Sequence, residues 1–164
     1  TYWRLGMGAG SGSGQIVISV PPETLETYFG GDAARRVRSV EATLALTSYN
    51  PPLVLDGAVY YGVALLGADG GGQGLQVQLV QPGVINLGQV AEGTARTVSQ
   101  RAVTNQIARL RLDRDLNTGA ITCFFNDEQI GPTLSGVGAS ASPALFVYAS
   151  GVIVSVSAWN ITLR

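Results

Sequence analysis

The chain has 164 residues, of which 46% are hydrophobic and 13% charged, enough apolar material for one globular domain with a substantial core. Its ten basic residues are all arginine and oppose eleven carboxylates, so the formal charge of −1 gives no general attraction to nucleic acid or anionic lipid. Because histidine and lysine are both absent, the sequence excludes Ser-His-Asp and Cys-His relays, imidazole metal ligands, lysine Schiff bases and the Walker lysine.

Few chemistry-bearing residues remain after these exclusions. A pair of carboxylates can still support glycoside hydrolysis, which needs neither histidine nor lysine. Cys123 is the only cysteine, so a disulfide within the chain is excluded, and we expect a buried thiol rather than an intermolecular bridge. No run of about 20 apolar residues predicts a membrane span. The chain opens at Thr1 rather than methionine, which favours a processed product or a piece of a longer protein.

The N-terminal segment is rich in glycine. Residues 6–14, GMGAGSGSG, lack the glycine register of a dinucleotide-binding loop, and a strand-like run follows them instead of a helix. They therefore predict a connector. We divide the chain into a glycine-rich N-terminal strand or arm, residues 1–14, and a single β-sandwich domain, residues 15–164.

One short helix is predicted near residues 22–30. Pro22 suits its first turn and Gly30 its end. Leu25, Tyr28 and Phe29 lie at helical spacing, and we expect this stripe to pack the helix onto the core.

From residue 37 onward the hydrophobic period changes to two. In residues 37–48, VRSVEATLALTS, one face carries Val40, Ala42, Leu44 and Leu46, while the other carries mostly polar side chains. About ten strand-like runs follow one another to the end of the chain, separated by glycine-containing turns. This pattern predicts an all-β fold, an antiparallel two-sheet sandwich of the jelly-roll type.

The stretch DRDLNTG, residues 113–119, offers oxygen ligands at alternating positions before a glycine. Asp113, Asp115 and Asn117 are therefore candidate calcium ligands, and calcium is the only cofactor that the sequence suggests. The strand-like runs on both sides favour a hairpin turn instead. The twelfth position, where an EF-type loop needs glutamate, is Phe124.

The region that contains this hairpin, RLRLDRDLNTGAITCFFNDEQIG, predicts a three-stranded meander and resembles the late strands of concanavalin A-like (laminin G-like, legume-lectin-like) sandwiches. Asn126 stands where that family has the asparagine of an Asn-Gly turn, and Asp127 replaces the glycine. The final run, residues 144–164, is similar to the closing strands of the family. The resemblance implies a two-sheet jelly roll whose N- and C-terminal strands pair.

The functions of that family divide between carbohydrate binding, protein adhesion and glycoside hydrolysis. Hydrolysing members carry a Glu-x-Asp-x-x-Glu strand, and this sequence has none. If the hairpin lies in the concave sheet, its exposed row carries Arg109, Arg111, Thr122 and Phe124, which suits a sugar: an aromatic ring beside hydrogen-bonding groups. The alternative is ordinary sheet surface, with arginine stems covering the ring.

The sequence thus predicts a non-catalytic, secreted or surface-displayed module that binds polysaccharide or another surface protein, with no nucleic acid partner and no insertion into a membrane. One alternative is a homo-oligomeric structural subunit of a filament, sheath, surface layer or capsid, in which the glycine-rich arm exchanges between neighbours. A second alternative is a glycoside hydrolase whose carboxylate pair, about 5 to 9 Å apart, comes from distant strands.

Overall fold

The computed structural model describes residues 3–6, 15–49, 60–67, 73–80, 84–91, 94–103, 107–135, 138–148 and 152–163. In chain order the elements are β1 (Trp3–Gly6), β2 (Gln15–Ser19), α1 (Pro22–Phe29), the 3₁₀ helix η1 (Ala33–Arg36), β3 (Val37–Tyr49), β4 (Tyr60–Gly67), β5 (Gln73–Val80), β6 (Val84–Ala91), β7 (Thr94–Ala102), β8 (Ile107–Arg114), β9 (Ile121–Phe125), β10 (Glu128–Leu134), β11 (Ala141–Tyr148) and β12 (Val152–Leu163). Within these ranges, no helix is both long and apolar enough to span a membrane.

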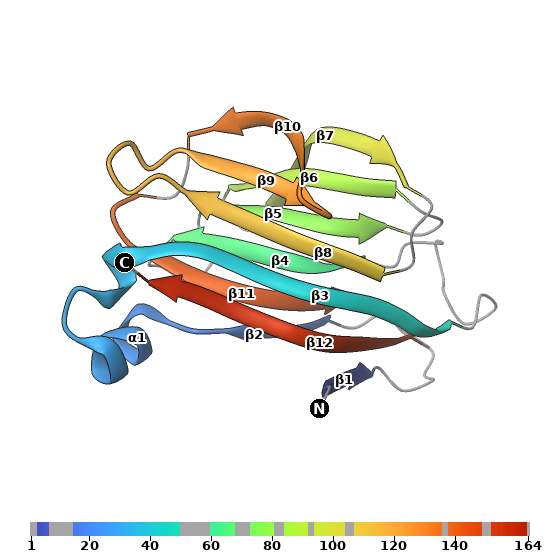
Figure 1. Ribbon diagram of the computed structural model, residues 1–164, viewed down its shortest axis with the longest axis horizontal. Coiled ribbons are helices and arrows are strands. Elements are labelled where there is room, and N and C mark those ends of the chain that lie inside the picture. Colours follow the sequence, from blue (N-terminus) through green and yellow to red (C-terminus); the bar gives the residue numbers. More distant parts are fainter. Residues whose placement is uncertain are drawn as a thin grey trace.

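The strands form two antiparallel six-stranded sheets that are stacked as layers, with α1 at one end (Figure 1). Sheet A has the order β1-β12-β3-β8-β9-β10, and sheet B has the order β2-β11-β4-β5-β6-β7. The first and last strands pair, with Trp3 opposite Val156. The predicted sandwich with paired terminal strands is therefore confirmed.

The core lies between the two sheets. As the alternation in residues 37–48 predicted, Val40, Ala42 and Leu44 are fully buried, whereas the side chain of Leu46 lies outside the part that the structure describes. Each large apolar side chain buried in this way stabilises the fold by about 1.5–3 kcal/mol. The largest fully buried side chains are Tyr61, Leu25, Leu44, Leu65, Ile85, Leu87, Leu110, Leu112, Ile121, Leu145 and Val37.

The predicted meander is formed by β8, β9 and β10, which neighbour one another in sheet A. Asn126 and Asp127 form the tight turn between β9 and β10 and have φ values of 48° and 67°, in the left-handed region that hairpin turns of this length use. Cys123 lies on the inner side of β9 and is buried, as expected, and burial raises the pKa of its thiol to about 12.

The two sheets meet along the edge where β10 of sheet A approaches β7 of sheet B. At Gly131 of β10 the φ value is +62°, and a Cβ there would lie 2.8 Å from the Cβ of Ser99, so only glycine fits. Next to this contact, Arg101 of β7 forms an ion pair with Glu128 of β10 at 2.7 Å. The approach closes one side of the core.

Helix α1 spans nearly the predicted residues, but the prediction that its whole aromatic stripe packs on the core is wrong. Leu25 is 1% exposed, whereas Tyr28 is 77% and Phe29 59% exposed. Gly30 turns the chain with a φ value of +101°, and the buried side chains that continue the contact with the core come from η1. The last turn of the helix therefore projects beyond the core.

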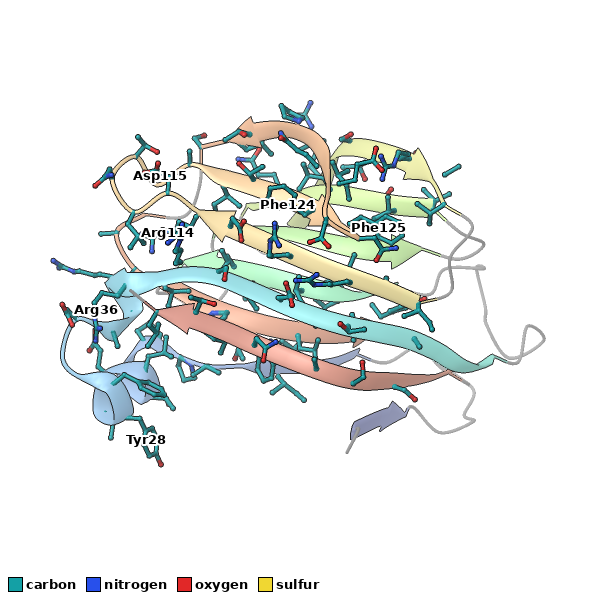
Figure 2. All side chains as sticks on the ribbon, viewed as in Figure 1. Tyr28, Arg36, Arg114, Asp115, Phe124 and Phe125 are labelled. Atoms are coloured by element: carbon teal, nitrogen blue, oxygen red, sulfur yellow. The ribbon has the colours of Figure 1, made fainter. Side chains whose placement is uncertain are left out.

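A buried cation lies at the end of β8. Arg114, labelled in Figure 2, is 5% exposed, and its Nη2 donates hydrogen bonds of 2.8 Å to the carbonyl oxygens of Gly138 and Ala139. Its Nη1 donates longer bonds of 3.4 Å to the carbonyl oxygens of Arg35 and Val37. One guanidinium thus connects η1, the start of β3 and the segment before β11.

Candidate functional site

The four predicted binding residues lie together on the outer face of sheet A. On β8 the alternation turns Ala108, Leu110 and Leu112 inward and its arginines outward. On β9, Thr122 and Phe124 face outward because their neighbours are buried. In the register of the two strands, Arg111 is opposite Phe124, and Asp113 is opposite Thr122. The local period of two is enough to produce this placement.

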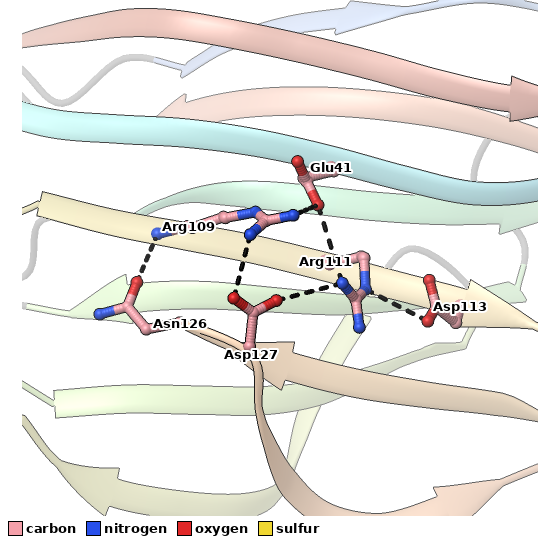
Figure 3. Close-up of polar contacts among 6 residues, drawn as sticks. All are labelled: Glu41, Arg109, Arg111, Asp113, Asn126 and Asp127. Carbon is pink, nitrogen blue, oxygen red and sulfur yellow. Dashed lines mark hydrogen bonds and ion pairs between the residues drawn. The ribbon is translucent and has the colours of Figure 1, made fainter.

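The arginines of this face are held by three carboxylates (Figure 3). Arg109 contacts Glu41 of β3 and Asp127 of the β9–β10 turn, each at 3.0 Å. Arg111 contacts Asp113 at 3.2 Å, Asp127 at 3.3 Å and Glu41 at 4.0 Å. We call these five residues the ionic network. Arg109, Arg111 and Asp113 share strand β8, whereas strand pairing brings Glu41 of β3 and Asp127 of the β9–β10 turn to them.

Glu41 and Asp127 were not predicted as site residues. The sequence placed Glu41 on the polar face of its strand and Asp127 in a turn, but it did not show that the two carboxylates approach the same guanidinium. The register supplies that information, because Glu41 is opposite Arg111 across β3 and β8.

The turn that carries Asp127 is fixed to β8. The backbone N–H of Asn126 donates to the carbonyl oxygen of Arg109, and the backbone N–H of Arg109 donates to Oδ1 of Asn126, both at 2.9 Å. This reciprocal pair holds the Asp127 carboxylate beside the arginines. The network is therefore preorganised, and its side chains lose less conformational entropy when a ligand binds.

The Phe124 ring is half-buried and shares the face with the network. The Cζ atom of Arg111 lies 4.4 Å from the ring centroid, a cation–π contact. Thr122 is joined by a hydrogen bond of 2.9 Å to Thr133 of β10. The Arg111 guanidinium thus covers part of the Phe124 ring, as we expected if this face is ordinary sheet surface. The polar groups around the ring remain at the surface.

The positive and negative charges of the ionic network nearly balance. The hydrogen bond with Glu41, followed by the charges of Glu41 and Asp127, raises the pKa of Arg109 and keeps it cationic. Burial raises the pKa of Asp113, and the charge of Arg111 opposes that shift. Two arginines and three carboxylates leave the network with a formal charge of −1 when all are ionised. Such a face does not select strongly charged ligands.

The structure places the candidate calcium ligand Asp113 apart from the turn that holds the other two, Asp115 and Asn117. Asp113 lies on the sheet face with Arg111, whereas Asp115 lies in the hairpin turn, where Oδ1 accepts the backbone N–H groups of Asn117 at 2.8 Å and Thr118 at 2.9 Å. These two bonds lower the pKa of Asp115. Within the described ranges, no group of three or more His, Cys, Asp or Glu residues is arranged to hold a metal ion. The geometry supports a hairpin turn at this loop.

The outer face of sheet B carries a second polar feature that sequence reasoning missed. Asn86 of β6 is 8% exposed, and its Oδ1 has no hydrogen-bond partner in the structure described. Its neighbours in the sequence, Ile85 and Leu87, are buried in the core, so Asn86 faces away from it. Because Asn86 lies within a mostly apolar stretch, nothing in the sequence indicated that this side chain would be a notable polar group.

Comparison with known proteins identifies the fold. No family model matches the chain, and no curated protein matches its sequence. The carbohydrate binding module CBM66 from Bacillus subtilis superposes with a TM-score of 0.54 at 10% identity, over 93% of this chain and 82% of that one. A β-glucanase of Bacillus licheniformis gives a TM-score of 0.52 at 12% identity, over 78% of this chain and 67% of that one.

A bifunctional GH43-CE protein of Bacteroides eggerthii gives a TM-score of 0.62 at 14% identity. The match covers 79% of this chain but only 19% of that protein, so the chain spans about a fifth of its length. Together these likenesses confirm the concanavalin A-like jelly roll. The fold is shared by carbohydrate-binding modules and carbohydrate-active enzymes, and at such identities it shows the architecture alone.

Proposed function

We propose that this domain is a non-catalytic module that binds a neutral polysaccharide on the outer face of sheet A. The observation that carries the proposal is the ionic network (Figure 3), in which Arg111 also contacts the Phe124 ring. The fold supports it, because carbohydrate-binding modules and carbohydrate-active enzymes have the same architecture.

The chemistry of the face suits a sugar. A pyranose presents hydroxyl groups around its rim and C–H groups on its faces, so it needs donors, acceptors and an apolar surface side by side. Arg109 and Asp127 are exposed and lie 3.0 Å apart, so a donor and an acceptor stand next to each other at the surface. The half-buried Phe124 ring supplies the apolar part.

The charge balance favours a neutral glycan. An acidic polysaccharide meets three carboxylates on this face, and a basic one meets two guanidinium groups that already have partners. A neutral chain can form hydrogen bonds with both kinds of group without a net electrostatic penalty.

The proposal that the module is non-catalytic is supported by its sequence and by the network. The sequence contains no histidine or lysine. A hydrolase with two carboxylates needs one of them as an acid and the other as a base or nucleophile. Glu41 and Asp127 come from distant segments, but Arg109 lies between them and contacts both. This arrangement resembles a binding network more than a hydrolytic pair.

A glycan array followed by titration calorimetry tests the proposal, with mixed-linkage β-glucan, xylan and alginate as probes. We expect binding to a neutral glycan and none to alginate, and we expect Phe124→Ala to weaken binding at least about tenfold. Val98→Ala, an exposed position on β7 of sheet B, is the control and should bind like the wild type. Unchanged binding by the Phe124 variant would remove sheet A as the site, and release of reducing sugar from any probe would contradict the non-catalytic assignment.

A further inference from the structure

Two adjacent aromatic side chains at the end of α1 are unusually open to solvent. Tyr28 is 77% and Phe29 59% exposed, and among the side chains whose exposure the structure describes they are the only aromatic ones in the exposed class. Figure 2 shows Tyr28 pointing away from the strands, at the end of the sandwich where α1 lies. Neither ring contributes to the core, so the burial of apolar surface within the fold does not explain their presence.

The backbone beneath the two rings is firmly held. Leu25 anchors α1 in the core, and the N–H of Gly30 donates to the carbonyl oxygen of Glu26 at 3.0 Å to end the helix. Arg36 of η1 donates through Nη2 to the carbonyl oxygen of Phe29 at 2.7 Å, and through Nε to Oδ1 of Asp32 at 2.9 Å. The aromatic pair is therefore presented on a packed base rather than on a loose chain end.

The area of the pair fits a small contact. Aromatic side chains bury about 150–250 Å² each, so at these exposed fractions the pair presents roughly 200–340 Å². A stable protein interface needs about 800 Å² from each partner. The other exposed large hydrophobic side chains described are in β2, β7, β8 and the β8–β9 hairpin, not in α1 or η1. The surface is therefore suited to one or two sugar rings rather than to a folded partner.

The polar groups beside the rings are those that a sugar uses. Asp32 is exposed, and the guanidinium of Arg36 lies at the base of the pair, bound to the Phe29 carbonyl oxygen. Rings that can stack on C–H faces thus adjoin a donor and an acceptor for hydroxyl groups, the combination also present around Phe124.

We propose that Tyr28 and Phe29 form a second contact for the polysaccharide, separate from the ionic network on sheet A; this inference rests on the proposed function. Helix α1 lies at one end of the sandwich, whereas the network lies on β3, β8 and the β9–β10 turn (Figures 1 and 3). A long polysaccharide can engage both contacts, and a short oligosaccharide only one. Two linked contacts raise the affinity for the polymer without changing the affinity of either contact.

The test compares a polymer with its short fragment. Calorimetry and affinity electrophoresis are performed with polymeric mixed-linkage β-glucan and xylan, and with the tetrasaccharide of each. We expect the double variant Tyr28→Ala, Phe29→Ala to bind polymer at least about tenfold more weakly and to keep the wild-type affinity for tetrasaccharide at sheet A. Phe124→Ala weakens binding to both. Tyr28→Phe keeps the ring and should bind polymer like the wild type.

Val17→Ala, which removes an exposed hydrophobic side chain from β2, is the matched control and should not change either affinity. The rings are exposed, so the double variant should unfold at the wild-type temperature. If it binds polymer with wild-type affinity, or loses tetrasaccharide binding as well, the second contact is overturned while the proposed function stands. If the wild type binds neither probe nor any neutral glycan of the array, the proposed function itself fails. Loss of self-association in sedimentation, with polymer binding unchanged, would assign the pair to protein contact instead.

Discussion

Strand β8 carries arginines on both of its faces, and the structure satisfies them in opposite ways. Arg109 and Arg111 point outward and pair with carboxylate side chains. Arg114 points inward, is 5% exposed, and donates its hydrogen bonds to backbone carbonyl oxygens. Burial lowers the pKa of Arg114, whereas the carboxylate partners raise the pKa of Arg109.

The difference shows how the same residue type serves structure on one face and recognition on the other. The backbone carbonyl oxygens that accept from Arg114 cannot rearrange to bind a ligand. Arg114 therefore serves to hold distant segments of the chain together. Carboxylate side chains at the surface can exchange a partner for a sugar hydroxyl. We therefore expect substitutions on the inward-facing side of β8 to change stability and substitutions on its outward-facing side to change binding.

The largest effect is expected from Arg114→Met. Methionine fills much of the volume, but the carbonyl oxygens of Gly138, Ala139, Arg35 and Val37 lose their donor, so the free energy of unfolding should fall by about 3–5 kcal/mol. Urea unfolding measures the loss. Arg114→Lys, which keeps the charge but reaches fewer carbonyl oxygens, should lose less and provides a folded variant if the first is too unstable. If the free energy of unfolding falls by less than about 1 kcal/mol in both variants, the structural role that we assign to Arg114, in contrast to Arg109 and Arg111, is wrong.

An intermediate effect is expected from Arg109→Gln on the outer face. Arg109 and Asp127 are exposed to solvent and only Glu41 is mostly buried, at 17% exposure, so the urea midpoint should move less than for either Arg114 variant. Binding of the neutral glycan should weaken at least about tenfold, because the donor between the two carboxylates is lost. Calorimetry on the same samples checks the split between stability and binding. A variant that loses stability but keeps its affinity would reverse the roles assigned to the two faces.

The smallest effect on stability is expected from substitution of Asp115, which tests the contribution of hydrogen bonds to the backbone at an exposed position. Asp115 follows Arg114 and is also held by backbone groups, but it is exposed. Its pKa is lowered from 3.8 by the N–H groups of Thr118 and Asn117, so its stabilising contribution is complete above about pH 3.8 and is lost as the pH falls through the lower, folded-state value. Asp115→Ala should therefore be less stable than the wild type at pH 7, and the difference should narrow at pH 2–3.

Asp115→Asn is the control for this pH dependence. The amide oxygen can accept the same N–H groups without titrating, so Asp115→Asn should retain most of the stability at pH 7. Thermal unfolding at the two pH values measures both variants. A difference between Asp115→Ala and the wild type that stays constant with pH would show that the carboxylate charge contributes nothing.

Sequence periodicity was a reliable guide wherever one residue's neighbours decide its direction. It predicted that Arg109, Arg111, Thr122 and Phe124 share one exposed face, because alternation along β8 and β9 requires it. It failed at Tyr28 and Phe29, where helical spacing predicted burial. Whether a helical stripe is covered depends on how far the core extends beneath it, and the spacing carries no information on that distance.

The sequence by itself determined the two-layer antiparallel fold, the hairpins of the meander and the burial of Cys123, because each follows from local alternation and turn chemistry. Only the tertiary structure decided that Glu41 and Asp127 join the arginines of β8, that Arg114 finds its partners in the backbone, and that the end of α1 remains uncovered. These contacts join residues as many as 79 positions apart, as between Arg114 and Arg35. Strand order and register bring them together, and neither is encoded in the residues next to them.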